Sequence, residues 1–465
     1  MTELTHADAP PFPAGGLEKE LGASRSEWGV DDLVALVRGE RIEIVSLMHV
    51  GGDGWLKTLD FVPRSVEHFS DIISGGERAD GSNVFAGSRI RPEASDIVLR
   101  PRVDSAFLDP FSPRPTLVLM CGHVAPDGTP LPESPDTILR RAGDRLRQET
   151  GVDLWGLGEV EYFLGKRRDE SDIYGADDRG YHATSPFVFG EGLRRRAMAL
   201  LAEIGVAVKY GHSEVGYIEA REAQGVIWEQ HEIELAARPL PEAADAVLLT
   251  QWVLRNLAHQ QGMRCTTAPM MLEGHAGNGL HFHFVIMRDG CQQDIRDAGG
   301  KLTDLARWLI GGLVQLGGAL MAFGNCVEGS FARLLQAKEA PSAITWGEHD
   351  RSALVRLPAV PRDAAGRMVA APTIEFRLPD GSALPHLLMA GAALSMIRGR
   401  DTEDLDGLLK RTASRKAVGR KVAASPVPRD FGEVAEALSA YRDTLEAGGV
   451  FPTEFIDGLV ARLRR

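Results

Sequence analysis

Cysteine is scarce in this chain. Its four cysteines, Cys121, Cys265, Cys291 and Cys326, lie far apart, and no two of them have the CxxC spacing of a zinc-binding turn. This pattern excludes a zinc knuckle and a disulfide-stapled framework. Few and scattered cysteines are typical of reducing compartments, so the sequence favours the cytoplasm.

Basic charge and long apolar runs are also scarce. The chain has 52 Lys and Arg against 65 Asp and Glu, which disfavours nucleic acid as a partner because phosphate-binding surfaces need clustered cations. The run Arg194, Arg195, Arg196 is predicted to be a solvated helix face. No uninterrupted apolar run is long enough to cross a bilayer, and the first residues lack the basic start and apolar stretch of a secretory signal. We therefore expect no membrane partner.

The remaining composition is that of an ordinary globular protein, with 44% hydrophobic and 25% charged residues. A chain of 465 residues can form one large and one smaller domain. The Pro- and Gly-rich start predicts a flexible tail at 1–26, and the Pro-containing stretch 124–135 predicts a domain boundary. We expect a small domain at 27–128 and a large one at 129–465.

The two predicted domains differ in their hydrophobic pattern. Short apolar runs broken by Gly and Pro predict strands of a small sheet at 41–50, 54–63, 95–101 and 116–124. The larger domain mixes strands with amphipathic helices, which are predicted at 136–150 and 241–262. Together these patterns predict an α+β protein.

Three predicted strands carry polar residues two positions apart. Because side chains alternate along a strand, each pair projects from one face. The pairs are Glu159 and Glu161, His281 and His283, and Glu375 and Arg377. A half-exposed strand with one wet face would explain any single pair. Since unpaired buried carboxylates are costly, three such pairs in apolar strands favour compensation by metals or partner cations.

Two further carboxylates, Glu214 and Glu232, lie in segments close together in the sequence. With Glu159, Glu161 and Glu375 they make five carboxylates, and His281 adds an imidazole. Oxygen-rich sites with an occasional histidine suit Mg²⁺ or Mn²⁺. Two adjacent metals can neutralise phosphate oxygens during phosphoryl transfer. The residues alone thus predict an oxygen-ligated metal site on a sheet and leave its reaction open.

The order of the motifs resembles the glutamine synthetases across nearly the whole chain. The motifs are ADGSN, GYHATSP, GEVEYF, HSEV followed by QHEI, GNGLHFH, FARL with KEAP, DRSALVRLP and TIEFRLPDGSA. The resemblance implies a small N-terminal β-grasp-like domain. It also implies a large catalytic domain with a curved antiparallel sheet flanked by helices.

By this resemblance the polar strands carry two metal sites for Mg²⁺ or Mn²⁺, with two or more ions per active site. One site comprises Glu161, Glu214 and Glu232, and the other comprises Glu159, His281 and Glu375. Gly277, His281, Glu214 and Tyr181 are implied to line the substrate site, where Arg333 and Arg377 hold the substrate carboxylate and the transferring phosphate. The planar fork of arginine suits both oxyanions.

The resemblance implies further roles around the nucleotide and the nitrogen substrate. His283, Arg351 and Arg356 match positions that bind ATP, and Arg351 is also implied in catalysis. Glu339 matches a flap glutamate. Asp80 matches the aspartate that helps to bind and deprotonate ammonium, in a pocket that Tyr181 lines.

The implied reaction has two steps: ATP phosphorylates the γ-carboxylate of glutamate, and ammonium then displaces phosphate from γ-glutamyl phosphate to give glutamine. One alternative is a ligase for another amine, such as methylamine, ethanolamine or a polyamine. Another is a non-catalytic relative. The family also implies homo-oligomeric six-membered rings with active sites between subunits. Because the chain ends at FIDGLVARLRR, we expect a dodecamer of stacked rings to lack the usual C-terminal clasp.

Four positions depart from the family pattern. Lys209, Val285 and Thr373 stand where an acidic residue, a serine and an arginine would contact ATP, which puts the adenosine end of the site in doubt. Ala276 replaces an asparagine near the glutamate. Glu214 and Glu232 are also 18 positions apart (232 − 214 = 18), a longer spacing than the family usually has, and the inserted segment 217–228 is predicted to rim the site.

Overall fold

The computed structural model describes residues 15–40, 42–85, 90, 92–169, 180–335, 339–414 and 424–465. The chain forms two compact units. The first comprises Met1–Ile138 with Ala197–Ala207, and the second comprises Leu139–Arg196 with Val208–Arg465. The chain passes from the first unit to the second after Ile138, inside the helix Pro135–Thr150. The predicted boundary at 124–135 ends where this helix begins.

The first unit is built around a mixed sheet. Its elements are α1 (Gly16–Leu21), η1 (Arg25–Glu27), α2 (Val30–Glu40), β1 (Ile44–Val50), β2 (Leu56–Phe61), α3 (Val66–Gly75), β3 (Glu77–Asp80), α4 (Gly81–Val84), η2 (Pro92–Ala94), β4 (Asp96–Pro101), η3 (Val103–Ser105), β5 (Phe107–Leu108) and β6 (Thr116–Val124). The strand order is β2-β1-β6-β4-β3, with β5 beside β6. β1 and β6 run parallel, and β1 and β2 form an antiparallel hairpin. All four strands predicted for this region are present.

Helices α2 and α3 contribute to the hydrophobic core of this unit. Leu33 of α2 and Phe69 of α3 are fully buried and belong to one core cluster with Val45 of β1. Leu17 of α1 is also in that cluster, so α1 packs against the core. The prediction of a flexible tail at 1–26 is therefore wrong for this helix. Residues 1–14 of that predicted tail lie outside the described residues.

The second unit contains α5 and α6 only in part, because residues 135–138 and 197–203 belong to the first unit. Its elements are α5 (Pro135–Thr150), β7 (Asp153–Arg167), α6 (Glu191–Glu203), β8 (Val208–Ile218), β9 (Val226–Leu235), β10 (Arg238–Pro239), α7 (Leu240–Gln260), β11 (Arg264–Thr266), β12 (Leu280–Arg288), β13 (Cys291–Gln292), α8 (Asp304–Gly324), α9 (Glu328–Leu335), β14 (Trp346–Glu348), β15 (Val355–Leu357), β16 (Ile374–Phe376), α10 (Pro385–Arg400), α11 (Leu405–Thr412), α13 (Phe431–Ala440), α14 (Arg442–Glu446), η4 (Ala447–Gly449) and α15 (Thr453–Leu463). Both helices predicted for this region, α5 and α7, are present.

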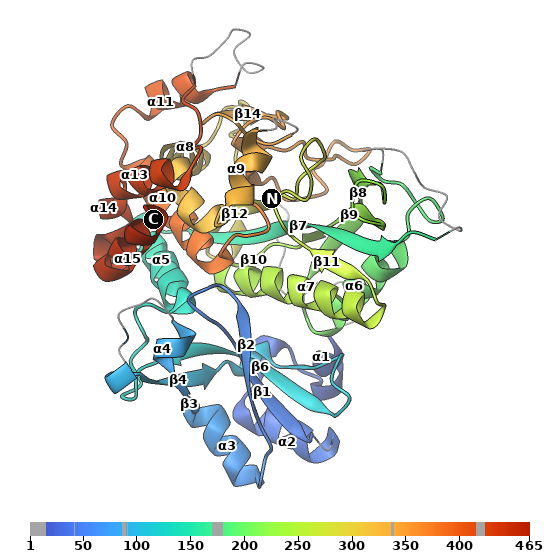
Figure 1. Ribbon diagram of the computed structural model, residues 1–465. Coiled ribbons are helices and arrows are strands. Elements are labelled where there is room, and N and C mark those ends of the chain that lie inside the picture. The colour runs from blue at the N-terminus through green and yellow to red at the C-terminus, as the bar shows by residue number, and fades with distance from the viewer. Residues whose placement is uncertain are drawn as a thin grey trace. The chain divides into compact units, whose positions relative to one another are not determined.

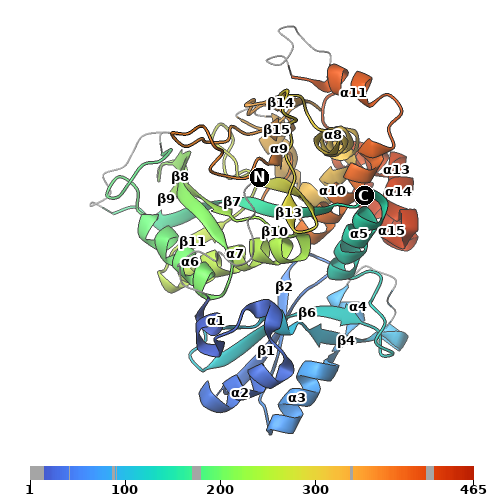
Figure 2. The same ribbon diagram turned by 180° about the vertical axis from the view of Figure 1, so that it is seen from behind.

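The sheet of the second unit brings together segments that are far apart in the sequence. Its order is β14-β15-β16-β12-β7-β9-β8, with β10 and β11 beside β7 and β13 beside β12. All its ladders are antiparallel except β14–β15. Figures 1 and 2 show the sheet curling, with α7 along one face. This arrangement confirms the predicted α+β fold class.

Helix packing covers the apolar side of this sheet. α7 lies against β7, where Gly158 allows the close approach: a Cβ there would come within 2.7 Å of Val247 Cγ2. α8 packs against α10. By length and composition α8 could also cross a membrane, which the sequence analysis did not anticipate, but 78% of its most apolar window is buried. α8 is therefore a core helix of this unit.

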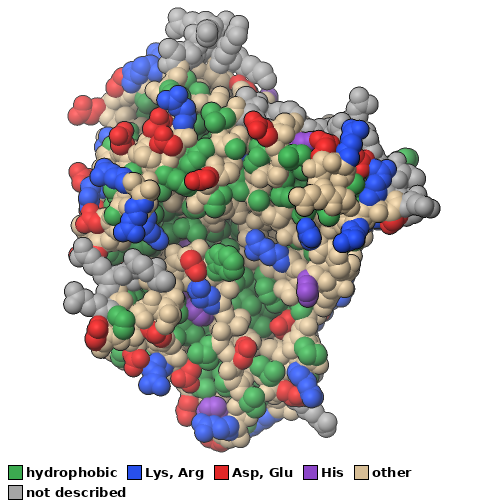
Figure 3. All heavy atoms as spheres, viewed as in Figure 1, with side chains coloured by type: hydrophobic (Ala, Val, Ile, Leu, Met, Phe, Trp, Pro, Cys, Tyr) green, Lys and Arg blue, Asp and Glu red, His purple; other side chains and the backbone are tan. Residues whose placement is uncertain are grey.

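Surface charge is mixed. On the face drawn in Figure 3, the described Lys and Arg side chains are interspersed with Asp and Glu and do not form one basic area. This distribution agrees with the net charge of −13.

Candidate metal and phosphate site

A cavity of about 640 Å³ lies in the second unit, over the polar face of its sheet. Five of the six predicted metal ligands line it: Glu159, Glu161, Glu214, Glu232 and His281. Glu375, the sixth, is completely buried on β16 beside His283 of β12. The structure therefore brings together the carboxylates that the sequence analysis singled out.

The antiparallel register explains this convergence. On β7, Glu161 lies opposite Glu232 of β9, which lies opposite His212 of β8. One step along the same face, Glu159 lies between His281 of β12 and Glu234 of β9. Polar side chains spaced two apart on each strand thus become neighbours across strands.

One group of potential ligands is the predicted set of Glu159, His281 and Glu375. One ligand atom from each lies within 4.8 Å of the others. His281 Nδ1 is 2.7 Å from Glu159 Oε2 and 3.9 Å from Glu375 Oε1. These three side chains are close enough to share one cation.

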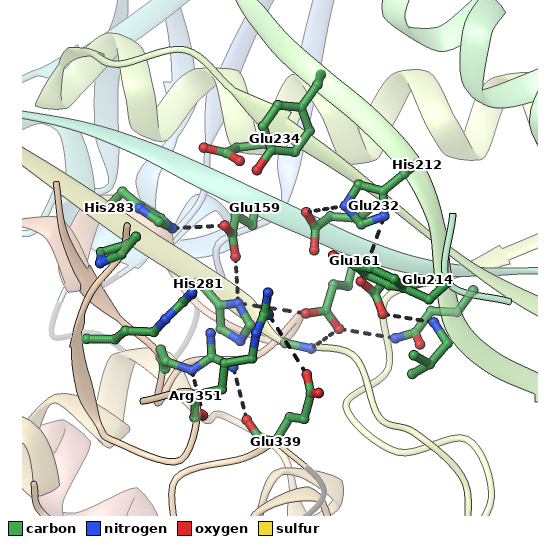
Figure 4. A pocket seen from close by; sticks show the side chains of 18 of the residues that line it. Glu159, Glu161, His212, Glu214, Glu232, Glu234, His281, His283, Glu339 and Arg351 are labelled. Carbon is green, nitrogen blue, oxygen red and sulfur yellow. Dashed lines mark hydrogen bonds and ion pairs between the residues drawn. The ribbon is translucent and has the colours of Figure 1, made fainter. Parts of the chain in front are cut away.

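The other group differs from the predicted set of Glu161, Glu214 and Glu232. Here the ligand atoms within 4.8 Å of one another belong to His212, Glu214 and Glu232. Glu161 is nearby, but its Oε2 accepts hydrogen bonds from Gly279 N at 2.8 Å and Gln230 Nε2 at 3.1 Å. Figure 4 shows His212 between Glu214 and Glu232.

Little positive charge from the protein compensates the carboxylates of this second group. Burial raises the pKa of Glu214 to about 7, and Glu161 adds to that shift. Burial, with Glu159 and Glu161, also raises the pKa of Glu232 well above its usual range. Burial raises the pKa of Glu161 itself. A cation bound beside these carboxylates would favour their charged forms.

The charges around Glu159 and Glu375 are instead compensated by protein groups. Burial favours a higher pKa for Glu375, but Arg377 holds that pKa below its usual range. Burial disfavours the charged form of His283, yet Glu159 and Glu375 raise its pKa to about 9. Burial and then Arg377 lower the pKa of His281 to about 4, so its ring is neutral at pH 7, as a metal ligand requires.

Three predicted arginines surround the same cavity. Arg333 and Arg377 are buried, and both donate hydrogen bonds to backbone carbonyl groups. Arg333 donates to the carbonyl of Leu378 at 3.1 Å, and Arg377 donates to that of Arg351 at 3.0 Å. Arg356 donates to Glu375 Oε2 at 2.8 Å, and Arg377 is in direct contact with the other oxygen. The guanidinium groups are thus fixed at the cavity wall.

Arg351, Glu339 and Tyr181 form a more exposed part of the lining. Arg351 Nη1 lies 4.0 Å from Glu339 Oε2, and both side chains are more than half exposed. Glu339 has a φ of 58°, a left-handed conformation that is uncommon for this residue type. Tyr181 stacks on His182 with ring centroids 4.3 Å apart, and burial raises its pKa.

Asp80 belongs to the first unit. Its side chain caps α4 by accepting from Ser82 N at 2.9 Å and Ser82 Oγ at 2.7 Å. Hydrogen bonds from Ser82 and Ser95 lower its pKa to about 2, so it is ionised at neutral pH. Its role toward ammonium stays a prediction.

The residues that depart from the family pattern also have defined positions. Lys209 Nζ is 2.6 Å from Glu234 Oε1, and Thr373 Oγ1 is 2.8 Å from His283 Nδ1. Both Lys209 and Thr373 line the cavity, as does Ala276. Val285 is buried. Next to Ala276, Gly277 is required by close packing, because a Cβ there would collide with the carbonyl of Pro269.

His212, Glu234 and Gln230 are site residues that the sequence analysis missed. His212 is two before Glu214, and Glu234 and Gln230 are each two from Glu232. The spacing of two that identified the other pairs would have found all three, had it been applied to the segments around Glu214 and Glu232.

Arg194 corrects the expectation of a solvated basic helix face. It is buried, and its Nη1 lies 2.7 Å from His231 Nδ1, while Arg195 and Arg196 are exposed as predicted. His231 Nε2 in turn lies 2.8 Å from Glu229 Oε1. Because side chains alternate along a strand, Glu229 and His231 project from the face of β9 opposite to Glu232. The contact between His231 and Arg194 connects this face to α6.

The inserted segment 217–228 lengthens the β8–β9 hairpin. Its ends are in the two strands and its middle forms the turn. Glu222 in the turn lies 3.2 Å from His275, a residue that lines the cavity. The segment therefore reaches the rim of the site.

The donor set of the two groups fits Mg²⁺ or Mn²⁺, because it consists of carboxylate oxygens with one imidazole in each group. Burial and neighbouring carboxylates raise the pKa values of Glu214 and Glu232, and a bound cation would counter both effects. The cluster can thus hold hard divalent cations beside arginines suited to phosphate.

Comparison with known proteins agrees with this geometry. Residues 132–464 match the family described as "Glutamine synthetase, catalytic domain". The chain is 27% identical to the glutamine synthetase of Vibrio cholerae, with 93% of this chain and 94% of the relative covered. It is 30% identical to that of Pseudomonas taetrolens, with 84% and 86% covered.

Among solved structures, a Plasmodium falciparum glutamine synthetase superposes with a TM-score of 0.78 at 19% identity, covering 94% of this chain and 95% of the other. A GmaS/ADP complex superposes with a TM-score of 0.72 at 19% identity, covering 93% and 94%. At these identities the structures support the fold. Taken with the sequence match over most of the chain, they lead to one conclusion: this chain belongs to the glutamine synthetase family of ligases.

Proposed function

We propose that this chain is an ATP-dependent ligase that joins ammonium to the γ-carboxylate of glutamate through γ-glutamyl phosphate. The observation that carries this proposal is the convergence of the acidic groups with Arg333, Arg356 and Arg377 around one cavity. Such a site can bind two anions, a carboxylate and a phosphate, next to each other. A free carboxylate is a poor acyl donor, so transfer of phosphate to it is the step that makes amide formation feasible.

The fixed arginines have the positioning role. Arg333 and Arg377 are held by backbone carbonyls, so they can present their remaining N–H groups to oxyanions without reorganising. Arg356, already anchored to Glu375, is placed to offset charge that develops on the transferring phosphate. Bound Mg²⁺ or Mn²⁺ would neutralise phosphate oxygens during the transfer.

The acidic side of the cavity has the role of binding and deprotonating ammonium. The exposed Glu339 is a carboxylate on this side, and Tyr181 lies at the same rim. Negative charge favours ammonium over neutral molecules, and a carboxylate can accept its proton before attack. Asp80 is proposed to contribute to the same step.

A second candidate function is ligation of a larger amine. A further cavity of about 420 Å³ shares Tyr181, Tyr210 and His212 with the main one. His182 and Tyr181 stack in its wall, and His182 has a φ of 58°. Aromatic faces next to carboxylates can hold the substituent of an organic amine.

Turnover with glutamate, ATP and Mg²⁺ or Mn²⁺ separates the candidates. Ammonium, methylamine, ethanolamine and a polyamine are compared by phosphate release, with products identified by mass spectrometry. Glutamine formation with ammonium is the expected result, and turnover with amines alone would reject ammonium. If the second cavity holds the substituent, Tyr210→Ala should lower kcat/KM for a large amine more than kcat/KM for ammonium.

The absence of turnover with every amine would overturn both proposals. Calorimetry then identifies the third reading: a non-catalytic relative would show no Mg²⁺-dependent binding of ATP. In an active enzyme, by contrast, Arg377→Met should abolish turnover. It should also lower the free energy of unfolding, because Glu375 loses a buried partner.

A further inference from the structure

Tyr181 and His182 are the two central residues of a β-turn at the edge of the main cavity. The amide of Ala183 donates to the carbonyl of Gly180 at 2.8 Å and closes the turn. The φ of 58° at His182 belongs to the left-handed region, which residues other than glycine seldom adopt. The turn exposes the ring of Tyr181, which lines both cavities. The position of that ring therefore depends on the groups that hold the turn.

Ser213 of β8 is hydrogen-bonded to this turn at both of its ends and at its centre. Its hydroxyl lies 2.8 Å from the carbonyl oxygen of Gly180 and 2.7 Å from that of Ala183, so its one proton serves both ends of the turn. Its carbonyl accepts from the amide of His182 at 2.9 Å. Because Ser213 is 1% exposed, water has little access to replace the hydroxyl as a donor.

The loop that leads from the turn to α6 has anchors of its own. Glu229 of β9 accepts from the backbone amide of Phe189 at 3.0 Å. Glu191 of α6 accepts from the backbone amide of Ser185 at 2.9 Å. These bonds do not involve Ser213, so loss of its hydroxyl should loosen the turn and leave the loop after it in place.

The side chain of Ser213 points away from the main cavity. Side chains alternate along β8, so Ser213 projects from the face opposite to its neighbours His212 and Glu214. Among the described residues, the lining of the main cavity includes both of these neighbours but not Ser213. The hydroxyl can therefore influence a substrate in that cavity only through the turn.

We propose that Ser213 is a positioning residue that fixes Tyr181 at the amine side of the site. The inference rests on the proposed ligase function, in which Tyr181 lies beside the incoming ammonium. When a binding-competent arrangement is populated for only part of the time, the apparent affinity falls in proportion. Loss of the Ser213 hydroxyl should therefore weaken ammonium binding more than the binding of glutamate or ATP.

Steady-state kinetics of the full-length protein test this role. In Ser213→Ala the KM for ammonium should rise about fivefold, the factor that corresponds to one lost hydrogen bond, while the KM values for glutamate and ATP stay within about twofold. Thr184→Val is the matched control. It removes a hydroxyl just after the turn, 3.3 Å from Glu191 Oε1, and should leave the KM for ammonium within about twofold of the wild type.

Tyr181→Ala shows whether Ser213 acts through Tyr181. On that background Ser213→Ala should raise the KM for ammonium no further, because the ring that it positions is absent. An unchanged KM in Ser213→Ala, an equal rise for all three substrates, or a rise that persists in Tyr181→Ala would overturn the inference and leave the ligase function standing. No turnover in the wild type would reject both. Should Ser213→Ala fail to fold, Ser213→Cys, whose thiol is a weaker donor, should raise the same KM by a smaller factor.

Discussion

The polar face of the large sheet has two sides with opposite electrostatics. Around Glu375, carboxylates pair with Arg356 and Arg377, and their negative charge keeps His283 protonated near neutral pH. Around Glu232, the neighbours are mostly other carboxylates, and pKa values rise. Both sides are buried on one sheet, where β12 and β7 lie between β16, which carries Glu375, and β9, which carries Glu232.

The difference shows that buried glutamates can stabilise the fold on one side of the sheet and bind ions on the other. On the paired side the protein supplies the countercharge, so the fold depends on the carboxylate being ionised. On the acidic side the countercharge must come from bound cations, so ionisation destabilises the metal-free protein. Variants on the two sides should therefore have opposite effects.

The largest effect is expected from neutralising Glu375. Glu375→Gln leaves Arg356 and Arg377 without their buried partner, which should lower the free energy of unfolding by about 3 to 5 kcal/mol. Glu232→Gln, on the acidic side, should raise it by about 1 to 3 kcal/mol because a poorly satisfied buried charge is removed. Urea unfolding in EDTA measures both. Losses of equal size would refute the contrast between the two sides.

The acidic side should also bind metal more weakly at low pH. Because Glu214 has a pKa of about 7, Mn²⁺ must displace its proton below that pH, and each displaced proton weakens binding about tenfold per pH unit. Calorimetric titration between pH 5.5 and 8 measures the slope. Glu214→Gln should bind weakly at every pH, with a flatter dependence. A dissociation constant that does not change with pH in the wild type would contradict this expectation.

The metal-free protein should become less stable as pH rises. Glu214 and Glu232 have raised pKa values in the folded state, so the folded protein binds more protons than the unfolded chain between their ordinary range and about pH 7. Their stabilising contribution is present at low pH and is lost as pH rises through about 7. A fall in Tm of about 5 °C between pH 5.5 and 8 in EDTA is expected, and excess Mn²⁺ should reverse it at pH 8.

The smallest effect is expected at Thr373 on the paired side. Thr373→Val removes the hydroxyl that lies 2.8 Å from His283 Nδ1, which should lower the free energy of unfolding by about 1 kcal/mol. Thr373→Ser keeps the hydroxyl and serves as the control. If both variants unfold at the same urea concentration, the hydrogen bond does not contribute to fixing His283.

Much of the fold followed from local patterns. Apolar runs and Gly or Pro breaks located β1, β2, β4 and β6, and the periodicity of the 136–150 and 241–262 segments located α5 and α7. Residues 16–21, predicted to be part of a flexible tail, form a helix instead. A helix this short is stable only because Leu17 packs against residues far away in the sequence. Arg194 was misjudged for a similar reason: its partner, His231, lies on another element.

For the site, the sequence by itself determined which strands carry polar pairs, and the order of the motifs pointed to the family. Only the tertiary structure decided which side chains share a cation-sized space, since that depends on strand order and register. It placed His212 with Glu214 and Glu232, and it joined Lys209 to Glu234. A spacing of two specifies the face of one strand, whereas the neighbour across the ladder is set by pairing between segments that are far apart in the chain.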